Sequence, residues 1–123
     1  MIKQDILENQ VKSIYLGIGS NLGNKKKNIE LAKFKLSENN IKILQSSSFY
    51  KSLSWPNPNN PKFLNIVIRI KTNLNPSKLL NLCKKIEKNL GRKKSTINSP
   101  RICDIDILDY NKKILKKDII LPH

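Results

Sequence analysis

The chain has 123 residues and a formal net charge of +15, with a pI near 10.0. This length suits one domain with a modest core and is too short for a two-domain enzyme. The charge suggests a polyanionic partner, but only three of the 24 basic residues are Arg, and the Lys residues are spread over nearly every segment. Asn and Ile are also abundant. The high content of Lys, Asn and Ile therefore indicates a bias in the base composition of the genome as much as a functional requirement for positive charge.

Cysteine content and hydropathy argue against a zinc- or disulfide-stabilised protein and against a membrane-spanning or secreted one. Cys83 and Cys103 are too few and too far apart for a zinc pattern or a disulfide framework, so we expect two reduced core residues. No apolar run approaches the length of a transmembrane helix, and residues 1–12 carry acidic side chains where a signal peptide needs an apolar stretch. We therefore expect a cytoplasmic protein with an N-terminal extension, residues 1–12, and a single domain, residues 13–123.

The domain begins with a predicted strand and a predicted helix. Residues 13–19 form a short apolar run that ends in glycine, as expected of a buried strand. A helix is predicted from Lys25, with Asn24 as its N-cap. Its apolar face recurs at helical spacing and consists of Ile29, Ala32 and Leu36.

Two predicted strands and a loop follow. Residues 41–51 and residues 63–72 are rich in apolar and β-branched side chains, and the second stretch alternates apolar with polar residues. Residues 52–62, between them, hold three Pro and three Asn, so they cannot continue the sheet as a regular hairpin. We expect a loop positioned by the strands on both sides.

The second helix has clear start and stop signals. Asn75 is a suitable N-cap, Pro76 suits the first helical position, and Gly91 closes the helix. Its apolar stripe consists of Leu79, Cys83, Ile86 and Leu90. A basic, polar segment, residues 92–99, leads into a last strand, after which a turn and a short apolar ending are predicted.

The last strand carries two carboxylates, Asp104 and Asp106, within an apolar run. Residues i and i+2 of a strand point the same way, roughly 6.5 Å apart, so the two acids should converge on one face. Mg²⁺ is commonly held by one or two carboxylates plus nucleotide phosphates. Arg101, three residues earlier, has the planar fork that suits phosphate oxygens. This pattern favours a magnesium-nucleotide enzyme; solvent-facing acids on an amphipathic strand are the alternative.

The element order predicts an α+β fold. Strand, helix, strand, strand, helix, strand is typical of a ferredoxin-like antiparallel four-stranded sheet (β-α-β-β-α-β) with both helices packed on one face. In that fold Cys103, Ile105 and Ile107 would face the helices. Asp104 and Asp106 would then lie on the open face of the sheet.

Four sequence blocks carry a family resemblance. They are YLGIGSNLG at 15–23, SFYKS at 48–52, FLN at 63–65, and SPR running into DIDIL at 99–108. With these blocks in order, the chain resembles the 6-hydroxymethyl-7,8-dihydropterin pyrophosphokinase family (2-amino-4-hydroxy-6-hydroxymethyldihydropteridine diphosphokinase) from about residue 13 to the end. Relatives continue beyond a Pro-His pair that matches Pro122 and His123, so the resemblance implies a chain lacking the family's C-terminal tail.

The resemblance implies transfer of diphosphate from ATP to the hydroxymethyl group of the reduced pterin, leaving AMP, in folate biosynthesis. Asp104 and Asp106 would hold two Mg²⁺ ions, and Arg101 and Arg92 would be catalytic. The implied ATP-binding residues are Lys84, Glu87, Lys94, Ile107 and His123. The implied pterin-binding residues are Ser52, Leu53, Trp55, Phe63 and Asn65. Gly17, Gly19 and Asn21 are interpreted as structural residues that shape the turn after the first strand.

Two other hypotheses stay open at this point. The first is a small basic RNA-binding α+β module, although the aromatic strand signature of RNA-recognition motifs is missing and acids on the open face would repel phosphate. The second is a different metal-dependent nucleotide transferase that uses the Asp-x-Asp pair. On the leading hypothesis the partners are ATP and the pterin, and the protein is a monomer that binds neither nucleic acid nor membrane.

Overall fold

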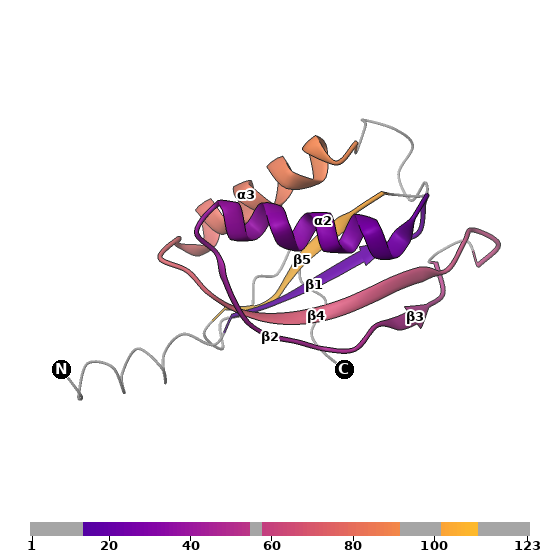
Figure 1. Ribbon diagram of the computed structural model, residues 1–123, viewed down its shortest axis with the longest axis horizontal. Helices are drawn as coiled ribbons and strands as arrows, with labels where there is room; N and C mark the ends of the chain where they lie inside the picture. The colour runs from indigo at the N-terminus through magenta and orange to yellow at the C-terminus, as the bar shows by residue number, and fades with distance from the viewer. Residues whose placement is uncertain (1–13, 55–57, 92–101, 111–123) are drawn as a thin grey trace.

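The computed structural model describes residues 14–54, 58–91 and 102–110. Its elements are, in chain order, β1 (Ile14–Ser20), α2 (Lys25–Glu38), β2 (Lys42–Ser46), β3 (Tyr50–Ser52), β4 (Phe63–Lys71), α3 (Pro76–Asn89) and β5 (Asp104–Tyr110). The strands pair antiparallel in the order β2-β4-β1-β5, and β3 also pairs with β4. Both helices lie on the same side of this sheet (Figure 1). The predicted N-terminal extension and the predicted apolar ending lie outside the described residues.

The expected α+β class is confirmed, but the sheet has five strands where we expected four. The predicted strand at 41–51 is divided into β2 and β3, which both pair with the same edge of β4. Between the pair Ser46–Ile68 and the pair Tyr50–Asn65, the outer ribbon has three residues and β4 has two. The extra residue shifts the register, and the ladder is interrupted there.

The two helices begin and end as their sequences predict. Asn24 and Asn75 are the N-caps, and their side-chain oxygens accept hydrogen bonds from the backbone N–H groups three residues on. Pro76 occupies the start of α3, where its missing N–H has no helical partner. Gly91 follows α3 with φ of 105°, a left-handed conformation that costs glycine little. Within the described residues, neither helix has the length and apolar character needed to cross a bilayer.

The core lies between the helices and one face of the sheet. In β1, β4 and β5, alternate side chains are buried toward the helices, as the period-2 pattern predicts. The core residues from these strands and both helices are Ile14, Leu16, Ile18, Ile29, Ala32, Leu36, Ile66, Ile68, Ile70, Leu79, Cys83, Ile86, Cys103, Ile105 and Ile107. This packing fixes the strands from the helix side, so the side chains on the open face of the sheet are presented from a well-packed support.

Candidate active site

The open face of the sheet carries two glycines along β1, Gly17 and Gly19, which we call the glycine strip. In register, Gly19 pairs with Asp104 of β5 on one side and with Asn65 of β4 on the other. One row further along, Gly17 pairs with Asp106. Because glycine has no side chain, β1 itself places none on this face at the two positions. The nearest side-chain atoms belong to Leu108, Asn65 and Phe63 of the flanking strands.

Strand alternation sets the direction of the two acids. Cys103, Ile105 and Ile107 are buried toward the helices, as predicted. Asp104 and Asp106 alternate with them and are half-buried, so they lie on the opposite face. The apolar residues anchor β5 to the core, and the same anchoring presents two carboxylates side by side over the glycine strip.

A cavity of about 180 Å³ lies over this strip. Its floor includes Gly17 and Gly19, and its walls come from β5, β4 and β3. The wall residues that matter here are Asp104, Asp106, Phe63, Asn65, Ser52 and Tyr50. The fold therefore brings the predicted metal pair and three of the five predicted pterin residues to one cavity.

Asn65 is oriented by its neighbours. Its Nδ2 donates to Ser52 Oγ at 2.9 Å and to the Tyr50 carbonyl at 3.3 Å. Within the described part of the chain, its Oδ1 accepts no hydrogen bond, although this oxygen is close to Gly19 at the cavity floor. The amide thus presents a fixed acceptor to the cavity, while its donor is used to hold β3.

Gly17 and Gly19 do not have the role predicted for them. They lie inside β1 and line the cavity, whereas we expected them to shape the turn after the strand. A Cβ on Gly19 would lie 2.8 Å from Asn65 Oδ1 and 3.2 Å from Phe63 Cδ1. The available signal was the presence of two glycines in an otherwise apolar strand, which often marks a close approach of a ligand or another chain segment.

The loop that follows β3 is tied to the end of β1. Asn21 is 2% exposed, and its Nδ2 donates to Ser54 Oγ at 3.1 Å and to the Pro61 carbonyl at 3.2 Å. Ser54 Oγ also donates to the Pro61 carbonyl at 2.6 Å. Lys25, at the start of α2, donates through Nζ to the Lys62 carbonyl at 2.8 Å. Asn21 is therefore a structural residue, as predicted, but its hydrogen bonds hold the loop after β3, whereas we expected it to shape the turn after β1.

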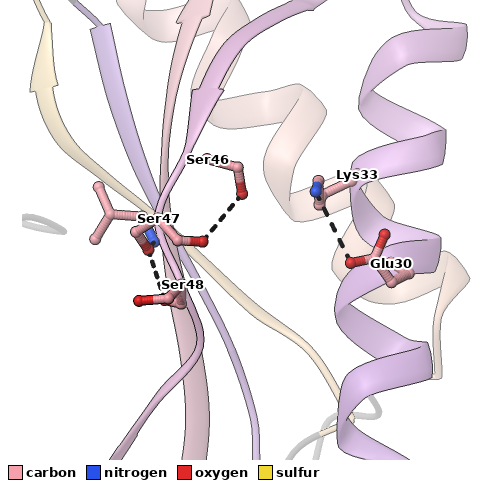
Figure 2. Close-up of polar contacts among 6 residues, drawn as sticks. Glu30, Lys33, Ser46, Ser47 and Ser48 are labelled. Carbon is pink, nitrogen blue, oxygen red and sulfur yellow. Dashed lines mark hydrogen bonds and ion pairs between the residues drawn. The ribbon is translucent and has the colours of Figure 1, made fainter.

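Ser47 joins the interrupted outer ribbon to β4. Its N–H donates to the Val67 carbonyl at 2.8 Å, and its Oγ accepts the Val67 N–H at 2.9 Å, so one residue replaces a lost ladder pair. Figure 2 shows the hydroxyl groups of Ser46 and Ser47 directed at the carbonyl of the following residue. Such local bonds compete with regular pairing, which explains why the strand breaks at this run of serines.

Comparison with known proteins identifies the family. The model of the 7,8-dihydro-6-hydroxymethylpterin-pyrophosphokinase (HPPK) family matches residues 15–123. The chain belongs to the HPPK family. It is 40% identical over 112 residues to the 2-amino-4-hydroxy-6-hydroxymethyldihydropteridine pyrophosphokinase of Aquifex aeolicus, a match that covers 90% of this chain and 69% of that protein.

Other relatives are similar over nearly the same part of this HPPK chain. The pyrophosphokinase of Methylorubrum extorquens is 35% identical over 111 residues, which cover 89% of this chain and 70% of the relative. The folic acid synthesis protein fol1 of Pneumocystis carinii is 40% identical over 113 residues, 91% of this chain. That match covers only 15% of fol1, so the chain spans a small part of this larger relative. Membership of this family favours the pyrophosphokinase hypothesis over the RNA-binding module and the different metal-dependent nucleotide transferase.

The remaining predicted residues of the HPPK site fall in several environments. Leu53 is 63% exposed beyond the end of β3, and Lys84 is exposed on α3. The Ile107 side chain is buried on the helix-facing side of β5, so only its backbone can approach the open face. Glu87 is also buried, in α3. Five predicted residues lie outside the described residues: Trp55, Arg92, Lys94, Arg101 and His123.

The chemistry of the cavity suits Mg²⁺ with a phosphate ligand. Two carboxylates stand on adjacent outward positions of one strand, and Mg²⁺ prefers oxygen ligands of this kind. Among the described residues, no group of three or more His, Cys, Asp or Glu side chains could hold a metal ion. Two carboxylates alone leave most positions around such an ion to other oxygen ligands, such as phosphate oxygens or water.

Cys83 lies behind the site, on the helix side of the sheet. Burial, with smaller contributions from the charges of Glu87 and Asp106, raises the pKa of its thiol to about 12. Cys83 and Cys103 are both buried and carry free thiols, as predicted. They are core residues of this HPPK chain and not nucleophiles.

Proposed function

We propose that the chain transfers the diphosphate of ATP to 6-hydroxymethyl-7,8-dihydropterin, with Mg²⁺, giving AMP and the pterin diphosphate in folate synthesis. Membership of the HPPK family supports this reaction. The single observation that carries the proposal is the convergence of an acid pair and three of the predicted pterin residues, Ser52, Phe63 and Asn65, on one cavity. Transfer between two substrates requires that their reacting groups meet, and this cavity has one set of groups for each.

Asp104 and Asp106 would hold the metal ions, two on the family pattern. Bound there, Mg²⁺ would neutralise phosphate charge and align the groups for in-line displacement. The two acids themselves orient the ions from a strand whose opposite face is packed in the core. Little covalent chemistry is required of the protein in phosphoryl transfer, so positioning and charge compensation are its main contributions.

The pterin would lie over the glycine strip. A flat heterocycle needs room above the strand, and Gly17 and Gly19 add no side chains of their own beneath it. Asn65 Oδ1 would accept a hydrogen bond from the edge of the ring, and Phe63 would contact its face. Ser52, which holds the Asn65 amide, would act on the pterin mainly through that amide.

The proposal includes several predictions that depend on the sequence resemblance. Arg101 and Arg92 would stabilise charge on the transferring group, and Lys84, Lys94 and His123 would contribute to ATP binding. Leu53 and Trp55 would cover the pterin. We also assign the ferredoxin-like fold, which the order β2-β4-β1-β5 supports, and we expect a cytoplasmic monomer.

The test is substitution of each acid. We expect Asp104→Asn and Asp106→Asn each to lower kcat/KM for AMP formation by a factor on the order of 10²–10³, because a charged ligand to the transferring phosphates is lost. Asp109→Asn is the matched control, since Asp109 lies on the same strand but does not line the cavity. Activity within threefold of the unsubstituted protein in both acid variants would refute the proposal. Mg²⁺-independent RNA binding that survives both changes would favour the RNA-binding hypothesis.

A further inference from the structure

Glu87 is an acid at a position where the helix requires an apolar residue. It follows Cys83 by four residues on the core-facing stripe of α3, and only 4% of it is exposed. It also lies in the last turn of the helix, where the macrodipole disfavours a negative charge. Packing and helix stability would both favour an apolar side chain here.

The carboxylate of Glu87 accepts a hydrogen bond from the neighbouring strand, β5. Its Oε2 accepts the backbone N–H of Ile105 at 2.6 Å, a short, charge-assisted hydrogen bond. Ile105 stands between Asp104 and Asp106, so the bond fixes β5 at the residue that separates the two predicted metal ligands. In the described sheet β5 is the last strand of the order, and its outer N–H groups need an acceptor from outside the sheet.

The charge of Glu87 strengthens its bond to β5. A neutral amide at this position could also accept the Ile105 N–H, but a carboxylate forms a shorter and stronger hydrogen bond. We attribute an acid that is unfavourable for the helix end and for packing in the core to what its bond does to β5.

We infer that Glu87 is a positioning residue for the Asp104 and Asp106 pair: its carboxylate holds the β5 backbone so that both acids keep the spacing that a divalent cation and a triphosphate require. The inference rests on the proposed function. It differs from the expectation that Glu87 contacts ATP directly, because the buried carboxylate acts from the helix side of the sheet through the backbone. Partners of this kind orient metal ligands and change metal affinity by about 10–100-fold.

The experiment measures Mg²⁺ affinity by calorimetric titration in the presence of a non-hydrolysable ATP analogue. We expect Glu87→Ala to weaken Mg²⁺-dependent binding of the analogue by about 10–100-fold. Glu87→Gln keeps an acceptor oxygen but loses the charge, so we expect a smaller loss of about 3–10-fold. Pterin binding, followed by fluorescence, should change less than about twofold in both variants, because Asn65 and the two glycines line the cavity on the open face, whereas Glu87 is buried in α3 on the helix side.

Glu30→Gln is the matched control. Glu30 is an exposed acid on α2 whose Oε1 lies 3.8 Å from Lys33 Nζ (Figure 2), and it does not line the cavity. The Glu30→Gln substitution removes the same charge from the protein without altering β5, so the Mg²⁺ affinity should not change. A second readout is amide hydrogen exchange by NMR: exchange of the Ile105 N–H should accelerate in Glu87→Ala, whereas exchange of the Ile68 N–H in β4 should not.

The outcomes separate this inference from the proposed function. If Asp104→Asn keeps Mg²⁺-dependent analogue binding, the proposed function fails. If Asp104→Asn loses that binding while a folded Glu87→Ala stays within twofold of the unsubstituted protein, only the positioning role is refuted. If Glu87→Ala does not fold, Glu87→Gln decides, and Mg²⁺ affinity within twofold in that variant would overturn the inference.

Discussion

Substitution of Gly19 by Ala tests the idea that the cavity needs a bare floor. The new Cβ would lie 2.8 Å from Asn65 Oδ1 and 3.2 Å from Phe63 Cδ1, so at least one side chain must move. Asn65 cannot rotate away without cost, because its Nδ2 is bonded to Ser52 Oγ at 2.9 Å and to a β3 carbonyl. Displacing the amide therefore loosens β3 and moves the acceptor that we assign to the pterin.

The change in the free energy of unfolding follows from two destabilising contributions and one stabilising contribution. Overpacking of this kind costs about 1–3 kcal/mol. Loss of the hydrogen bond to Ser52 adds about 1 kcal/mol. Alanine in a strand interior is better than glycine by about 0.5–1 kcal/mol, and Gly19 is not among the residues with positive φ, so the backbone accepts the change. We expect a net destabilisation of about 1–3.5 kcal/mol and an increase of more than about tenfold in the KM for the pterin.

Gly17→Ala is the matched control for stability. Its new Cβ would meet Leu108 Cδ1 at 3.4 Å, an ordinary van der Waals distance. We expect its free energy of unfolding, measured by urea denaturation with circular dichroism, to equal or slightly exceed that of the unsubstituted protein. If Gly19→Ala is as stable as Gly17→Ala and keeps the original KM for the pterin, the reasoning about the floor is wrong.

Three further predictions concern the supports of the site. Ser47→Ala should lower the free energy of unfolding in urea by about 1 kcal/mol because the Val67 N–H loses its acceptor, and an equal loss in Ser46→Ala, whose hydroxyl makes only a 3.4 Å contact, would contradict this. Asn21→Ala should lower the free energy of unfolding by about 1–3 kcal/mol in the same assay and expose the loop at 52–62 to limited proteolysis. Unchanged cleavage would refute the role of the Asn21 hydrogen bonds in holding this loop. Cys83 has a folded pKa of about 12 against an ordinary 9.0, so its contribution to stability is complete below pH 9 and declines above it, by at most about 1.4 kcal/mol per pH unit. Cys83→Ala should flatten the decline in unfolding free energy between pH 9 and 11. If the pH dependence of this free energy is the same with and without the substitution, the raised pKa of Cys83 is wrong.

Local signals in the sequence predicted most of the fold. The Asn caps and the apolar stripes gave both helices, because capping and helical periodicity depend on residues within a few positions of each other. The alternation in β5 likewise predicted that Asp104 and Asp106 would lie opposite the core. These features need no knowledge of distant parts of the chain.

Features that depend on strand pairing were not predictable in this way. The division of the strand at 41–51 arises because Ser47 takes both the N–H and the carbonyl of Val67 and so replaces regular pairing. The cavity floor arises because β1 pairs with both β4 and β5, which places Gly19 between Asn65 and Asp104. The sequence shows the glycines, but only the register shows what stands beside them.

The irregularity in β5 explains how one short strand carries three acids without burying one. The register shifts after the pair Leu16–Ile107, because Tyr15 pairs with Asp109, and Leu108 is the extra residue. A regular strand would alternate Asp109 to the helix side with Ile107, where burial of a carboxylate costs several kcal/mol. The bulge instead directs Leu108 over Gly17 at the edge of the cavity and keeps Asp109 out of the core. Bulges beside functional sites commonly re-aim side chains in this manner, and here the bulge both protects the core and completes the cavity wall.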